Sequence, residues 1–125
     1  MLVDTHVVLE LLLAGGRLGP RAYDAVAGEQ VFVSTVSVWE IAIKRRLGKL
    51  PVPSGWETAV QESGFRSLPM LAEHASAIGE VEGLKHEDPF DRLLLSQARI
   101  EGLDFWTGDR AILAAGLPYV RDARS

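Results

Sequence analysis

The chain has 125 residues, a formal net charge of −4 at pH 7 and no cysteine. This length supports one hydrophobic core, so we expect residues 1–125 to form a single domain. The missing cysteine excludes a disulfide scaffold, a thiolate metal site and a cysteine nucleophile, and it is compatible with a cytoplasmic location. Asp4, His6 and Glu10 interrupt the apolar N-terminal residues and no basic segment precedes them, which predicts neither a signal peptide nor a membrane span.

Strand-like and helical patterns alternate in the first third of the chain. Residues 1–3 form a short apolar run that predicts a central strand, and residues 6–14 repeat apolar side chains at helical spacing. A second helix is predicted over residues 20–27, because it opens with a proline and stops at a glycine. Residues 31–33 are apolar without alternation, which is typical of a strand covered on both faces.

A long helix is predicted to follow this second strand and to end near Leu47. Ser37 and Glu40 have the spacing of a capping box, which gives Glu40 a structural explanation. Trp39, Ile43 and Leu47 recur on one face of the helix, which predicts either a core contact or one wall of a groove for a partner.

The remaining elements continue the same alternation. Helical patterns cover residues 56–62, 70–81, 89–98 and 110–115. Strand-like runs cover residues 65–69, 103–107 and 118–120, and the first ends at a proline, as edge strands do. Asp88 and Pro89 are the predicted N-cap and first residue of the third of these helices, which places Asp91 at its third position.

Alternating strands and helices predict an α/β fold with helices on both faces of a mainly parallel sheet of four to five strands. In such sheets, ligands bind beyond the carboxyl ends of the strands, where the strand order reverses. Asp4 and Asp109 each follow a predicted strand, and Glu40 and Asp91 lie in helices that can begin at the same edge.

Each of these four acids has a structural explanation as a cap or a first-turn residue. Four carboxylates at one edge would nevertheless repel one another unless a cation were present. Oxygen ligands without cysteine or a histidine pair favour Mg²⁺ or Mn²⁺ over zinc. A hard cation in an open cleft is suited to phosphodiester hydrolysis.

Four blocks of sequence, in this order and spacing, resemble the PIN domain (PilT N-terminus) family, and more narrowly its VapC-like toxin ribonucleases. The blocks are residues 1–7, residues 33–50, the Asp88-Pro89-Phe90-Asp91 motif with the residues after it, and Thr107-Gly108-Asp109. The resemblance covers nearly the whole chain and implies a three-layer α/β/α PIN-like fold.

The resemblance also implies a Mg²⁺- or Mn²⁺-dependent endoribonuclease that acts as the toxin of a type II toxin–antitoxin pair. Asp4 and Asp91 match metal ligands of the family, and Glu40 and Asp109 match acids that complete the site directly or through water. The expected partners are an RNA substrate, a cognate antitoxin and a second copy of the chain, and no membrane.

Further residues are expected to support this site. Thr5, Ser37 and Thr107 match hydroxyl positions that orient the carboxylates or bind phosphate, although turn and cap roles also explain them. The candidate contacts to RNA phosphates are Arg92, Arg110, Lys44 and Arg45.

Three other functions compete with this interpretation. A phosphoacceptor receiver-type signalling domain has similar length and an acidic pocket, but it needs an aspartate after a mid-chain strand, where this chain has Leu68-Pro69. A dehalogenase-type phosphatase needs a second aspartate where this chain has His6. A catalytically silent PIN-like binding module has the same sequence features as an active nuclease, so only an assay separates the two.

Overall fold

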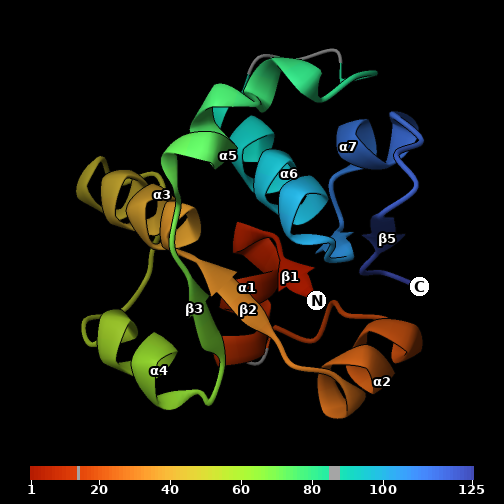
Figure 1. Ribbon diagram of the computed structural model, residues 1–125. Helices are drawn as coiled ribbons and strands as arrows, with labels where there is room; N and C mark the ends of the chain where they lie inside the picture. Colours follow the sequence, from red (N-terminus) through yellow and green to blue (C-terminus); the bar gives the residue numbers. More distant parts are fainter. Residues whose placement is uncertain (14, 85–87) are drawn as a thin grey trace.

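The computed structural model describes residues 1–13, 15–84 and 88–125 (Figure 1). Within these ranges, five strands form one sheet in the order β3-β2-β1-β4-β5, and all four pairings are parallel. The strands are β1 (Leu2–Val3), β2 (Phe32–Ser34), β3 (Arg66–Leu68), β4 (Phe105–Thr107) and β5 (Val120–Asp122). The predicted three-layer α/β/α fold is confirmed, and β1 is the central strand.

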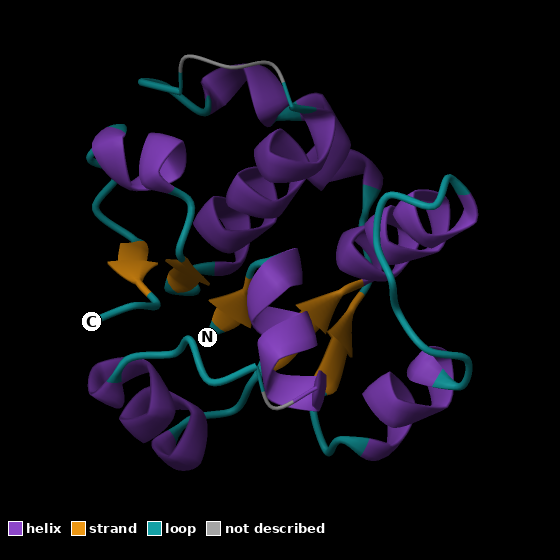
Figure 2. Cartoon of the chain, turned by 180° about the vertical axis from the view of Figure 1, so that it is seen from behind, coloured by secondary structure: helices purple, strands orange, loops and turns teal. Residues whose placement is uncertain are grey.

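Helices cover both faces of the sheet because its central strands are apolar on both sides (Figures 1 and 2). Val3 of β1 packs in one core with Val7 and Val8 of α1 (Thr5–Leu13) and with α2 (Pro20–Gly28). Leu2 packs in the opposite core, to which α6 (Pro89–Glu101) and α7 (Arg110–Ala114) contribute. Leu2 and Val3 are both fully buried.

Two further helices flank the sheet on the side of its β3 edge. A smaller apolar cluster joins α3 (Thr35–Arg46) to α4 (Trp56–Glu62) through Ile41, Val52 and Trp56. The helix α3 also contacts α6, and the two lie next to each other in Figure 1. None of the helices among the described residues is long and apolar enough to cross a membrane.

The helix predicted over residues 70–81 is interrupted. It consists of α5 (Ala72–Ser76) and a 3₁₀ turn, η1 (Ile78–Glu80). Ala77 leaves helical geometry between them, with φ −91° and ψ 5°. Gly79 follows, and glycine is a poor helix former, which disfavours continuing the α-helix past this point.

The predicted capping box of Ser37 and Glu40 is wrong. Ser34 is the N-cap of α3, and its Oγ accepts a hydrogen bond of 2.9 Å from the backbone N–H of Val36. The helix therefore starts three residues before the predicted cap, because Ser34 ends β2 and turns the chain directly. This shift moves Glu40 into the second turn, where its carboxylate is not needed for capping.

The start of α6 and the bounds of α1 can also be compared with their predictions. Asp88 caps α6 as expected, since its Oδ1 accepts from the backbone N–H groups of Phe90 and Asp91. The helix α1 begins at Thr5 and extends at least to Leu13; its predicted last residue, Ala14, lies outside the described residues.

Candidate active site

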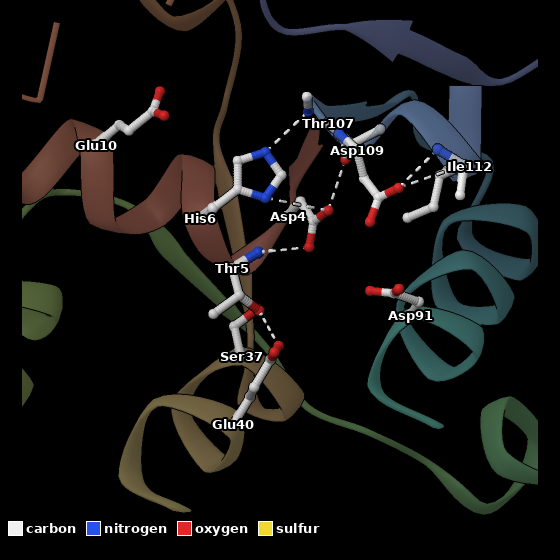
Figure 3. Close-up of polar contacts among 12 residues, drawn as sticks. Asp4, Thr5, His6, Glu10, Ser37, Glu40, Asp91, Thr107, Asp109 and Ile112 are labelled. Atoms are coloured by element: carbon white, nitrogen blue, oxygen red, sulfur yellow. Dashed lines mark hydrogen bonds and ion pairs between the residues drawn. The ribbon is translucent and has the colours of Figure 1, made fainter. Parts of the chain in front are cut away.

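The four predicted acids converge at the carboxyl edge of the sheet. The strand order reverses between β1 and β4, and Asp4 and Asp109 follow these two strands. Glu40 reaches the same place from α3, and Asp91 reaches it from the first turn of α6 (Figure 3). Together they line a cavity of about 200 Å³, with Thr5, His6, Leu9, Lys44, Leu50 and Asp88.

Asp4 is fixed by hydrogen bonds to both of its carboxylate oxygens. The backbone N–H of Thr5 donates to Oδ1 at 2.7 Å, and the Thr107 hydroxyl donates to Oδ2 at 2.6 Å. The residue is 3% exposed, and burial raises the pKa of its carboxyl above the ordinary value of 3.8. These contacts orient a carboxylate that would be costly to bury without a counter-charge.

Glu40 is buried and is bound on both carboxylate oxygens. Its Oε1 lies 2.6 Å from the Thr5 hydroxyl, and its Oε2 accepts from the Lys44 ammonium at 2.5 Å. The Thr5 hydroxyl also lies 2.9 Å from the Ser37 hydroxyl. Because Thr5 has a single hydroxyl proton to donate, we assign that proton to the carboxylate and the Ser37 proton to Thr5. Of the predicted supporting hydroxyls, Thr5 and Thr107 therefore contact the acids directly, and Ser37 contacts Thr5.

Asp91 is a second acid whose pKa is raised. Burial and the negative charges of Asp4, Asp88, Asp109 and Glu40 raise its pKa from 3.8 to about 8. At neutral pH without a cation, the Asp91 carboxyl therefore retains a proton.

Asp109 combines a structural contact with a place at the cavity. Its Oδ1 accepts from the backbone N–H groups of Ala111 and Ile112 at 2.8 and 3.3 Å, so it is the N-cap of α7. Its second carboxylate oxygen points toward the space between Asp4 and Asp91 (Figure 3). One carboxylate oxygen of Asp109 therefore caps α7, and the other faces the acids of the site.

His6 lines the cavity, and we did not predict a role for it. The backbone N–H of Gly108 donates to its Nε2 at 2.8 Å, which leaves the ring proton on Nδ1 when the histidine is neutral. This Nδ1 lies 3.5 Å from Asp4 Oδ2 (Figure 3). His6 thus connects the turn before Asp109 to Asp4, and no local sequence pattern signals a contact across 102 positions.

A half-buried arginine packs on the other side of this turn. A Cβ atom on Gly108 would lie 2.7 Å from Nε of Arg124, so only glycine fits without displacing the guanidinium. Arg124 Nη1 is held in turn by both carboxylate oxygens of Glu10, at 2.7 and 2.8 Å, and by the carbonyl of Arg17 at 3.0 Å. The turn that carries Asp109 is therefore fixed from two sides.

The four predicted phosphate contacts are dispersed, and Lys44 is the one that lines the cavity. Arg45 donates to the carbonyl of Val52, and Arg92 donates to the carbonyls of Val81 and Leu84. Arg110 is 68% exposed and pairs with Asp122 at 3.3 Å.

The donor set fits a hard divalent cation. Among the described residues, five carboxylates and one ammonium line the cavity, which has room for a cation that keeps several of its waters. Apart from the His6 ring, the donors at hand are carboxylate and hydroxyl oxygens, the ligands that Mg²⁺ and Mn²⁺ prefer. The raised pKa of Asp91 indicates that these acids are not neutralised by the protein alone.

Glu73, His74 and Glu101 form a second cluster, with potential ligand atoms within 4.8 Å of one another. His74 is fully buried, and its Nδ1 accepts from the backbone N–H of Leu71 at 2.9 Å. The neutral ring therefore carries its proton on Nε2, which donates to Glu101 at 2.8 Å. Both ring nitrogens are engaged, so this cluster joins α5 to α6. These contacts give His74 a structural role.

The PIN domain family model matches residues 1–116 of the chain. The match spans most of the sequence, so the chain belongs to the PIN domain family, and the resemblance found from the motifs is confirmed. This membership rules out the receiver-type alternative. Comparison with curated proteins gave no significant match.

Several solved structures share the fold. A toxin–antitoxin complex from Klebsiella pneumoniae has a chain 19% identical, with a TM-score of 0.65 over 96% of this chain and 94% of that one. VapBC2 from Rickettsia felis, bound to a DNA fragment from its promoter, is 15% identical, with a TM-score of 0.66 over 97% and 96%. FitAcB from Neisseria gonorrhoeae is 20% identical, with a TM-score of 0.62 over 95% and 94%.

Proposed function

We propose that this PIN domain is a Mg²⁺- or Mn²⁺-dependent endoribonuclease and the toxin of a type II toxin–antitoxin pair. The observation that carries the proposal is the convergence of Asp4, Glu40, Asp91 and Asp109 around one cavity, with the pKa of Asp91 raised to about 8. A cation would remove the repulsion that raises this pKa.

Asp4 and Asp91 are the proposed direct ligands, and Glu40 and Asp109 complete the site. A bound divalent cation would supply Lewis acidity toward the phosphoryl oxygen and would lower the pKa of a water bound to it. Thr5 and Thr107 keep the Asp4 carboxylate in one orientation, which avoids reorganisation when the substrate binds.

The other side chains of the cavity have their own proposed roles. Lys44 carries the one ammonium of the described lining and is the proposed contact for a phosphate next to the cut bond. Its ammonium already pairs with Glu40, so the charge lies at the acids before substrate arrives. Thr5 donates to Glu40 and accepts from Ser37, which keeps the Glu40 carboxylate directed into the cavity.

The partner proposals rest on the structural neighbours. The Klebsiella pneumoniae structure is a toxin–antitoxin complex, and all three structures named above share the fold over nearly the whole chain. We propose that this chain also has a small antitoxin partner, forms a homodimer and acts in the cytoplasm as one domain. A partner could inhibit by placing an arginine against the carboxylates, because a guanidinium forms bidentate pairs with carboxylate.

The test is cleavage of a mixed RNA pool by the purified chain with Mn²⁺, with Mg²⁺ and with a chelator. The proposal predicts cleavage that requires the metal, is lost in Asp91→Asn and is retained in Asp24→Asn, an exposed acid on α2. Co-expression with the product of a neighbouring small reading frame should give a stable complex that no longer cleaves. No cleavage by a folded wild type would identify a silent binding module instead. Metal-independent cleavage would indicate a contaminating nuclease.

A further inference from the structure

An exposed aromatic side chain immediately precedes Glu40 of the acidic cavity and is not among the residues that line it. Trp39 is 50% exposed, whereas Trp56 and Trp106 are 5% and 8% exposed. The predicted alternative that the stripe of Trp39, Ile43 and Leu47 is core is wrong at both ends, because Leu47 is 60% exposed. Tryptophan is enriched at contact surfaces, so an exposed indole indicates a binding role.

Phe90 supports Trp39 from the neighbouring helix. Their ring centroids are 5.0 Å apart and the ring planes are inclined by 71°, an edge-to-face arrangement that fixes the indole orientation. Trp39 comes from α3 and Phe90 from the first turn of α6, so the pair bridges two helices that lie next to each other (Figure 1).

The aromatic pair is linked to the acids by sequence and by contact. Trp39 immediately precedes Glu40, and Phe90 immediately precedes Asp91. The Lys44 ammonium, which contacts Glu40, lies 6.0 Å from the centre of the Phe90 ring. A phosphate near Lys44 therefore has the Phe90 ring beside it, and that ring contacts Trp39.

We propose that Trp39, supported by Phe90, is a stacking surface for an unpaired nucleobase of the substrate, next to the phosphodiester that is cut. The inference rests on the proposed nuclease function and adds a requirement for single-stranded RNA. A nucleotide combines a flat ring with an anionic phosphate, and this surface offers an aromatic face beside an ammonium. A base inside a duplex has both faces covered by its neighbours, so it cannot stack here.

The structure provides a selective optical probe for this contact. Because Trp56 and Trp106 are buried, quenching by an added oligonucleotide reports chiefly on Trp39. Tyr23 on α2 is 49% exposed and does not line the acidic cavity, so Tyr23→Ala is a matched control for removing an exposed aromatic ring.

The experiment titrates the full chain carrying Asp91→Asn, which prevents cleavage, with a short mixed-sequence single strand of RNA and with the same strand in a duplex. The single strand should quench the tryptophan emission to saturation, and the duplex should not. Binding measured by anisotropy of a labelled strand should weaken about tenfold in Trp39→Ala, remain near the starting value in Trp39→Phe, and stay unchanged in Tyr23→Ala.

Equal affinity of Trp39→Ala and its parent for the single strand would overturn the inference. The inference would also be overturned if Trp39→Ala abolished self-association or binding of the protein partner and left RNA binding intact. In that case the indole would be covered by a protein and not by a nucleobase. Cleavage of RNA by the chain with Asp91 intact is measured separately. An active Trp39→Ala enzyme with unchanged KM refutes the stacking contact alone, whereas an inactive wild type that still shows the quench refutes the nuclease proposal alone.

Discussion

Replacing Asp91 by asparagine should stabilise the metal-free protein at alkaline pH. The pKa of Asp91 is raised to about 8, chiefly by burial and then by repulsion from Asp4 and Asp88. The folded chain therefore holds a proton on Asp91 that the unfolded chain releases near pH 4. The stability that this proton contributes is fully present below pH 4 and is lost as the pH rises through 8. The asparagine side chain of the variant does not titrate, so its contribution has no such dependence.

The full shift corresponds to an upper limit of about 6 kcal/mol at pH 8.5. Asp91 is only partly buried, and solvent screening reduces the effect, so we expect about 2 kcal/mol, or about 6 °C in Tm. The assay is thermal unfolding with a chelator at pH 5, 7 and 8.5, and the advantage of Asp91→Asn should grow with pH. Asp24→Asn removes an equal charge from an exposed site on α2 and is the control.

Adding Mn²⁺ should reverse this order. Binding to the native state stabilises the wild type by about 2.7 kcal/mol at a hundredfold excess over Kd, and the variant should gain much less. A variant that is no more stable than the wild type at pH 8.5 without metal would refute the idea that these carboxylates repel one another across a shared site.

Three further substitutions test separate parts of the structure. Glu40→Gln should lower RNA cleavage by about 100-fold or more. Its unfolding free energy should change by less than about 1 kcal/mol, because the amide oxygen still accepts from the buried Thr5 hydroxyl. Full activity in the RNA assay would return Glu40 to a structural role. Ser34→Ala should cost about 2–3 kcal/mol in urea unfolding, because it removes the cap of α3 and leaves the buried Gln97 oxygen without its 2.5 Å partner; a loss below about 0.5 kcal/mol would contradict this. Gly108→Ala should cost about 1–3 kcal/mol in the wild type and less in an Arg124→Ala background, and strictly additive losses would show that the two do not interact.

The elements that the sequence predicted best are those with a local physical cause. Asp88 followed by Pro89 is a start signal that needs no tertiary contact, and α6 begins there. The apolar residues of β1 predicted a central strand because a run covered on both faces has no polar side to expose. The four acids were found because each follows a strand or lies near a helix start, and parallel strands bring such positions to one edge.

The incorrect predictions concern choices that tertiary contacts decide. Ser34 and Ser37 are both acceptable N-caps in sequence, and the position of the β2 end selected Ser34. The break at Ala77 lies in a segment of good helix formers, with Gly79 two residues later, so the local sequence has no strong stop signal there. His6 contacts Gly108 across 102 positions, and Arg124 is held beside Gly108 by Glu10, 114 positions away, so no periodicity or spacing could have indicated them.

The central claim is that the four carboxylates form one site for a divalent cation. A direct measurement of Mn²⁺ binding tests it. Mn²⁺ would be titrated into the chain at pH 7.5, with free ion followed by electron paramagnetic resonance. We expect saturable binding in the wild type and in Glu101→Gln, which alters the His74 cluster, and at least tenfold weaker binding in Asp4→Asn and Asp91→Asn. Binding that survives in both aspartate variants and disappears in Glu101→Gln would contradict the account and place the metal at the other cluster.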